Sequence, residues 1–152
     1  MNKIVRYIND HREELNKNQA TFWNCSGDVF DKIEDRVLSH SSSAKLQDDK
    51  LYIFLQHNSD EDTTIEIEID KNEVVVTVAG MGRSMIAIAD DRDEKTYFST
   101  IKKYLLAALS GSYKKKVYYR KDEPIKSQLI WKTSSFPTMT YSSFLLSLKE
   151  KF

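Results

Sequence analysis

The clearest pattern in the sequence is an alternation of isoleucine with acidic residues. In residues 65–70, isoleucines at 65, 67 and 69 alternate with the acidic residues Glu66, Glu68 and Asp70. Successive side chains of a β-strand point to opposite faces. A period of two therefore predicts a strand with one buried apolar face and one exposed acidic face.

Three other runs rich in β-favouring residues surround this strand, at 51–55, 74–78 and 85–89. Residues 70–73 and 80–82 join consecutive runs and contain the residue types of tight turns. Strands joined by short turns pair as antiparallel neighbours. The pattern predicts a meander of about four strands between residues 50 and 90.

Residues 1–40 follow a helical period instead. Apolar side chains recur on one face in two groups, which are Ile4, Val5, Ile8 and Leu15, then Val29, Phe30, Ile33 and Val37. Residues 24–27 separate the groups and contain turn-forming types. Two helices are predicted here, and the serine-rich segment 39–43 is expected to be a connection.

A third helix is expected between Asp90 or Asp91, which can cap its start, and Gly111, which can end it. Its apolar face comprises Tyr97, Phe98, Ile101, Leu105, Ala108 and Leu109. Lysines 102 and 103 lie toward its C-terminal end, where the helix dipole favours positive charge.

Two further elements are predicted after this helix. Residues 116–119 and 128–131 are expected to form a pair of strands joined around 122–124. Helical spacing then returns from Thr138 or Thr140, with apolar positions at Tyr141, Phe144, Leu145, Leu148 and Phe152.

These elements predict an α+β fold in one domain, residues 1–152. The chain has 152 residues, of which 40% are hydrophobic and 30% charged, a composition that supports one compact core. The expected architecture is an antiparallel sheet of five or six strands, made of the meander and the later strand pair, with helices packed mainly on one face.

The expected localisation is cytoplasmic. Cys25 is the single cysteine, which excludes an intramolecular disulfide and favours a reducing compartment. Residues 1–15 carry several charges and no apolar run of the secretory type, and no stretch approaches the roughly 18 apolar residues of a membrane span. No membrane partner is predicted.

No segment carries a catalytic or metal-binding motif at the required spacing. The calcium-binding loop and the H-E-x-x-H pair are absent, and nothing around Cys25 matches a catalytic signature. Residues 99–102 fit S-x-x-K, but its partner motifs S-D-N and K-T-G are missing. The sequence therefore predicts a protein that is not an enzyme and has no cofactor and no metal.

Positive and negative charges occupy different parts of the chain. The formal net charge is zero, yet residues 60–94 hold 3 basic and 11 acidic side chains, whereas residues 95–152 hold 12 basic and 3 acidic ones. An acidic middle segment on a rigid sheet favours encounter with a basic protein. The predicted partner-binding residues are Glu66, Glu68, Asp70, Asp90, Asp91 and Asp93, with Trp23 and Trp131 as candidate anchors.

The basic C-terminal part supports an alternative. An extended strand places cations and an aromatic ring on one face, and the candidate nucleic-acid-binding residues are Lys114, Lys116, Tyr118, Arg120 and Lys121. The overall charge balance is neutral, which makes nucleic acid the less favoured partner. Lysines on an edge strand also prevent unwanted strand pairing.

In size, α+β composition, cytoplasmic character and lack of a catalytic motif, the chain resembles the small bacterial immunity proteins that neutralise toxins, including those of contact-dependent inhibition systems. The resemblance implies a non-enzymatic protein that binds a basic, nuclease-like toxin and occludes its active site. It rests on general character and transfers no individual binding residue.

Overall fold

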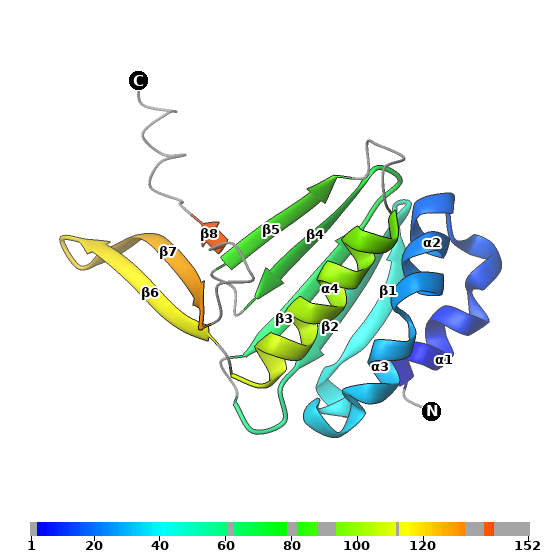
Figure 1. Cartoon of the computed structure of the whole chain (residues 1–152), viewed down its shortest axis with the longest axis horizontal. Helices are drawn as coiled ribbons and strands as arrows, with labels where there is room; N and C mark the ends of the chain where they lie inside the picture. The colour runs from blue at the N-terminus through cyan, green and yellow to red at the C-terminus, as the bar shows by residue number, and fades with distance from the viewer. Residues whose placement is uncertain are drawn as a thin grey trace.

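The computed structural model confirms the α+β class, with helices covering one face of an antiparallel sheet and a smaller sheet following it (Figure 1). The structure describes residues 3–60, 63–78, 82–87, 94–111, 113–132 and 139–141. The expected capping residues Asp90 and Asp91 lie outside these ranges.

The first sheet is the predicted meander with one additional edge strand. Its order is β1-β2-β3-β4-β5, every neighbouring pair is antiparallel, and the strands are β1 (Ser43–Gln47), β2 (Lys50–Gln56), β3 (Thr64–Ile69), β4 (Glu73–Val78) and β5 (Gly82–Ala87). The expected turn at 80–82 does not include Gly82, which already pairs with Val78 as the first residue of β5.

Strand β1 was not predicted, because its alternation is short: only Ala44 and Leu46 are apolar, and both pack partly buried against the core. It joins β2 through a two-residue turn in which Asp48 and Asp49 both have positive φ, 54° and 62°. Two positive φ angles define the hairpin turn whose twist matches that of the strands, and aspartate tolerates this conformation better than most residues.

The N-terminal region forms three helices where two were expected. These are α1 (Lys3–Asp10), α2 (Lys17–Ser26) and α3 (Asp28–Lys32), with 3₁₀ turns η1 (Arg12–Glu14), η2 (Glu34–Arg36) and η3 (Ser39–Ser41). Asn16 starts α2 with a capping box: its side chain accepts a hydrogen bond from the Gln19 backbone, and the Gln19 side chain accepts one from the Asn16 backbone.

The predicted turn at 24–27 is instead the end of α2. The chain stays helical at Gly27, with φ −59° and ψ −30°, before α3 begins. A Cβ atom at Gly27 would lie 2.7 Å from the Trp23 carbonyl oxygen, closer than packed atoms approach. Glycine therefore fits here because the chain packs closely against Trp23, one helical turn earlier in α2, and not because a turn requires it.

Helix α4 (Glu94–Leu109) lies across the same face of the sheet as α2 (Figure 1). Four of its predicted core residues are buried, namely Ile101, Leu105, Ala108 and Leu109. Gly111 has φ +71°, as expected of the residue that ends a helix. The side chains of Tyr97 and Phe98 lie outside the described part.

The core fills the space between the helices and the sheet. The three alternating isoleucines are buried, and the core also holds Leu51, Ile53, Leu55, Val74, Val76, Val78, Ile4, Ile8, Phe22, Val29, Phe30 and Ile33. The predicted buried face of β3 is thus confirmed.

An ion pair joins α3 to α4 on the outside of this layer. Lys102 Nζ lies 2.9 Å from Asp28 Oδ1, and this hydrogen bond is the main cause of a lowered pKa of Asp28. Since the folded-state pKa lies below the unfolded one, the contribution is present above about pH 4 and is lost as pH falls through the folded pKa.

Asp28→Asn should therefore lower the free energy of unfolding at neutral pH by about 0.5 kcal/mol or less, because the side chain is 54% exposed and screened by solvent. Urea unfolding at neutral and acidic pH checks this, with Asp31→Asn as control. An equal effect of Asp28→Asn at both pH values would contradict the assignment.

The later strands form a second sheet of their own. Its order is β6-β7-β8, with strands β6 (Tyr113–Arg120), β7 (Glu123–Trp131) and β8 (Met139–Tyr141). The predicted pair is confirmed, but the single sheet of five or six strands is divided into two, which meet where β8 and β7 contact β5.

The C-terminal helix does not begin at Thr138 or Thr140. Met139–Tyr141 is a strand, because it pairs with residues 127–129 of β7, a long-range contact that the local helical spacing does not encode. The remaining predicted positions, from Phe144 to Phe152, lie outside the described residues.

Candidate functional site

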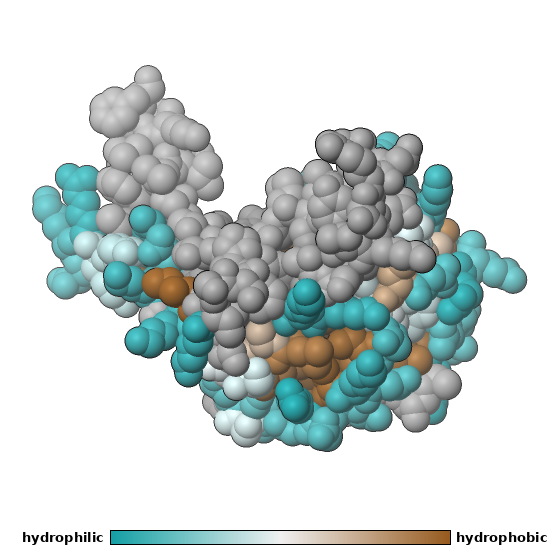
Figure 2. Space-filling view, viewed as in Figure 1, coloured by the Kyte–Doolittle hydropathy of each residue, from teal (hydrophilic) through white to brown (hydrophobic). Residues whose placement is uncertain are grey.

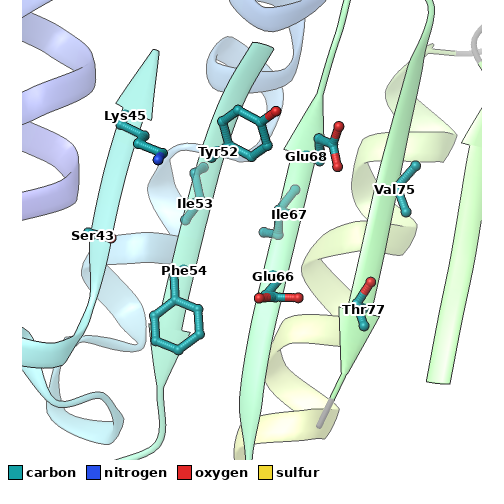
Figure 3. A pocket seen from close by; sticks show the side chains of 10 residues that line it. All are labelled: Ser43, Lys45, Tyr52, Ile53, Phe54, Glu66, Ile67, Glu68, Val75 and Thr77. Carbon is teal, nitrogen blue, oxygen red and sulfur yellow. The ribbon is translucent and has the colours of Figure 1, made fainter. Parts of the chain in front are cut away.

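The face of the first sheet that turns away from the helices carries a shallow hollow of about 590 Å³. Figure 3 shows this open face with the helices behind it. Side chains from β1, β2, β3 and β4 line it: Ser43, Lys45, Tyr52, Phe54, Glu66, Glu68, Val75 and Thr77. The buried Ile53 and Ile67 contribute the floor.

Strand register arranges these side chains in two rows across the sheet. One row runs through Lys45, Tyr52, Glu68 and Val75, and the next through Ser43, Phe54, Glu66 and Thr77. Residues directly opposite each other in antiparallel strands share a face and lie close enough to interact. The register thus places two half-buried aromatic rings beside two glutamates.

The glutamates differ in their surroundings. Glu68 Oε1 lies 2.6 Å from Lys50 Nζ, and this hydrogen bond raises the pKa of Lys50 above its ordinary value. Glu66 is exposed, and within the described part of the chain its carboxylate has no ion pair and no hydrogen bond. Glu66 is therefore the carboxylate on this face that can meet an external cation without breaking an existing contact.

The aromatic rings have distinct roles. Lys45 Nζ lies 5.6 Å from the centroid of the Tyr52 ring, a cation–π distance. Phe54 has no such partner among the described residues and stands beside Glu66 (Figure 3). The alternation in 51–55 already placed Tyr52 and Phe54 opposite the buried Leu51, Ile53 and Leu55, and this was the signal that sequence analysis left unused.

The predicted acidic residues separate into three groups. Glu66 and Glu68 lie on the open face as expected. Asp70 lies in the β3–β4 turn, where its Oδ1 accepts hydrogen bonds from the backbone of Asn72 at 2.7 Å and Glu73 at 2.8 Å. Asp90, Asp91 and Asp93 lie outside the described residues.

The described part of this face is balanced in charge. Lys45 and Lys50 offset Glu66 and Glu68, so the acidity of segment 60–94 is not concentrated in the hollow itself. Trp23 is not a surface anchor, since it is 5% exposed and its Nε1 donates to Asn9 Oδ1. The Trp131 side chain lies outside the described part.

The predicted basic residues gather on β6 and its turn. Lys114, Lys116 and Tyr118 share one face of the β6–β7 hairpin. Arg120 lies opposite Glu123 in the strand register, and Lys121 lies in the turn. Lys126 of β7, which no local pattern in the sequence singles out, stands directly opposite Tyr118. The open face and the hairpin are thus two separate candidate surfaces.

The helical side of the molecule has fewer features of a binding site. Among the residues coloured in Figure 2, most on this side are hydrophilic, and an apolar area lies beside the C-terminal half of α4, the helix that carries the 39% exposed Leu106. Among the described residues, no group of three or more His, Cys, Asp or Glu side chains could hold a metal ion. His57 is held structurally, with Nε2 donating to the Leu109 carbonyl oxygen at 2.9 Å.

Comparisons with protein-family models, curated proteins and solved structures give no match for this chain. In the described part of the chain, no helix combines the length and the apolar character that crossing a membrane requires.

Proposed function

We propose that the chain is a non-enzymatic protein-binding domain that receives a basic protein partner on the open face of the first sheet. The observation that carries this proposal is the placement of Phe54 beside Glu66, which has no ion pair among the described residues, with Tyr52 in the next row, over a hollow of about 590 Å³. Aromatic residues in partly desolvated hollows are the usual centres of binding energy at protein interfaces.

Phe54 and Tyr52 supply apolar contact area at low conformational cost, because each ring has two main side-chain torsions. Both side chains are already half-buried by their neighbours, which limits the entropy that binding removes. They are the expected anchors of the interface.

Glu66 supplies the charge complementarity. An Arg or Lys of the partner can approach it from solvent, whereas the Glu68 carboxylate is occupied by Lys50. The net charge of −8 over residues 60–94 adds a longer-range attraction for a basic surface. Such charges act mainly on the association rate and on the choice of partner.

The specific form of the proposal is an immunity protein that blocks a basic, nuclease-like toxin. A rigid sheet laid over an active site inhibits by steric occlusion and needs no catalytic group of its own. The resemblance in size and general character supports this form, and the binding face described above would provide the occluding surface.

Phe54→Ala should weaken partner binding by about 30-fold or more, the loss expected for an aromatic hot spot. Glu66→Gln should slow association and flatten its salt dependence, with little effect on dissociation. Surface plasmon resonance measures both rates, and Lys103→Ala on the exposed side of α4 is the matched control.

Photocrosslinking locates the surface independently. A photoreactive phenylalanine analogue at position 54 of the full chain should capture the partner, and the same analogue at position 103 should not. Capture from position 103 with none from position 54 would move the interface to the helical side.

The immunity form has its own probe, the protein encoded immediately upstream of this chain. Binding of that protein and loss of its nuclease activity are expected. If it neither binds nor is inhibited, the immunity form is wrong, while a position-54 crosslink to another basic protein would retain the broader proposal.

A further inference from the structure

The β6–β7 hairpin projects from the molecule on the side away from helices α1–α3 (Figure 1). Seven of the residues in 113–132 are Lys or Arg and two are Asp or Glu, a net charge of +5. This surface is separate from the open face of the first sheet, and its charge has the opposite sign to that of segment 60–94.

One face of the hairpin gathers an aromatic ring and several lysines. Tyr118 is directly opposite Lys126, and Lys116 is directly opposite Gln128. The ammonium groups of Lys126 and Lys116 lie 4.8 Å and 5.5 Å from the Tyr118 ring centroid, within cation–π distance. The Tyr118 hydroxyl donates to Gln128 Oε1 at 3.0 Å, which holds the ring in place.

Three lysines elsewhere in the described structure are neutralised by carboxylates. Lys32 and Lys102 pair with Asp28, and Lys50 pairs with Glu68. Within the described residues, no carboxylate pairs with Lys114, Lys116 or Lys126. Their charge is therefore available to an external anion.

We infer that this face of the β6–β7 hairpin binds single-stranded nucleic acid. The lysines would contact the phosphates, and a base would stack on the Tyr118 ring. Stacking would displace one lysine ammonium group from the ring toward the phosphate backbone of the bound nucleic acid. This activity goes beyond the proposed protein binding and uses none of the residues of the open face.

The ring decides between single-stranded and duplex nucleic acid. Lysines alone would bind either form through phosphate contacts. An aromatic platform adds stacking that an unpaired base offers and a base inside a duplex does not, and such stacking tolerates any sequence. The occupant is thus a single strand with little base preference.

The test is fluorescence anisotropy of the full chain with labelled oligothymidylate, longer than the about 4–16 nucleotides that a single-strand-binding fold covers. At about 50 mM salt, the chain should bind this probe more tightly than a duplex of equal length. The double substitution Lys116→Gln with Lys126→Gln should weaken binding by about tenfold. It should also reduce the steepness of the plot of log binding constant against log salt concentration by roughly 1.4, about 0.7 per lost phosphate contact.

The matched control is Lys17→Gln with Lys103→Gln, which removes the same charge from exposed positions on α2 and α4. It should leave binding nearly unchanged. Equal losses in the two double variants would overturn the inference, because they would reduce it to a general charge effect. Absence of binding by the wild-type chain at about 50 mM salt would also overturn it.

Tyr118 provides the second readout. Tyr118→Leu should weaken single-strand binding by about 5- to 100-fold and leave duplex binding unchanged, whereas Tyr118→Phe should retain single-strand binding. If Tyr118→Leu has no effect on single-strand binding while its thermal unfolding matches the wild type, the hairpin lysines serve to protect an edge strand and the inference is wrong.

Discussion

Gln19→Glu should lower the free energy of unfolding by about 3 kcal/mol. It removes the donor of a buried clasp, by which we mean the two hydrogen bonds that join the Gln19 side chain of α2 to the first sheet. Gln19 is 1% exposed, and its Nε2 donates to the carbonyl oxygens of Asp49 and Ile69, each at 2.9 Å. The carboxylate has nearly the same volume but cannot donate, so two carbonyls near the sheet lose a partner and a negative charge is placed beside them.

The clasp matters because it ties the start of α2 to one end of the sheet. Asn18 continues it, donating to the Asp70 carbonyl oxygen at 2.9 Å in the β3–β4 turn. Together the two side chains hold the β1–β2 and β3–β4 turns against the helix that the Asn16 capping box begins. Removing Gln19 thus acts on helix and sheet together.

Urea unfolding followed by circular dichroism measures the effect. Thr21→Ala is the control in the same helix, since the Thr21 hydroxyl makes an exposed bond to the Lys17 carbonyl oxygen and its loss should change stability by about 0.5 kcal/mol or less. A result for Gln19→Glu as small as that of the control would show that the clasp contributes little.

Ile67→Ala should lower the free energy of unfolding by about 2–5 kcal/mol, whereas Glu66→Ala should change it by about 0.5 kcal/mol or less. The two residues are neighbours in β3 but point to opposite faces. Ile67 is 1% exposed in the core beneath the helices, and Glu66 is exposed on the open face.

This pair of variants tests the one-sided covering of the sheet. The large-to-small substitution at Ile67 leaves a cavity that surrounding side chains fill only in part. Shortening the exposed Glu66 side chain leaves no cavity. Thermal and urea unfolding of both variants give the comparison. A large loss of stability with Glu66→Ala would mean that another layer covers the open face, and the protein-binding surface would have to lie elsewhere.

The strands of the meander were predictable because burial on one face imposes an alternation on the sequence. Ile65, Ile67 and Ile69 face the helices, so the positions between them could remain polar. The same rule places Tyr52 and Phe54 on the open face, and it was the apolar character of the whole run 51–55 that obscured them. Helix α4 was predictable for a similar reason, since its core positions recur with the helical period.

Other features depend on contacts distant in sequence. β1 carries only the short alternation of Ala44 and Leu46, and it forms by pairing with β2 across a turn of two aspartates. Residues 139–141 become a strand by pairing with β7. The candidate site shows the same limit: the pairing of Glu68 with Lys50, which leaves Glu66 as the available carboxylate, joins residues 18 positions apart.

The sequence by itself determined the α+β class, the buried faces of the central strands and α4, and the separation of acidic and basic segments. These features follow from local periodicity and composition, which are properties of a short segment and do not depend on its distant neighbours in the fold. Only the tertiary structure decided that the strands form two sheets, that α2 clasps two turns through Asn18 and Gln19, and that Lys126 joins Lys116 around Tyr118. Those arrangements arise from strand register and long-range hydrogen bonds, whose partners no local pattern specifies.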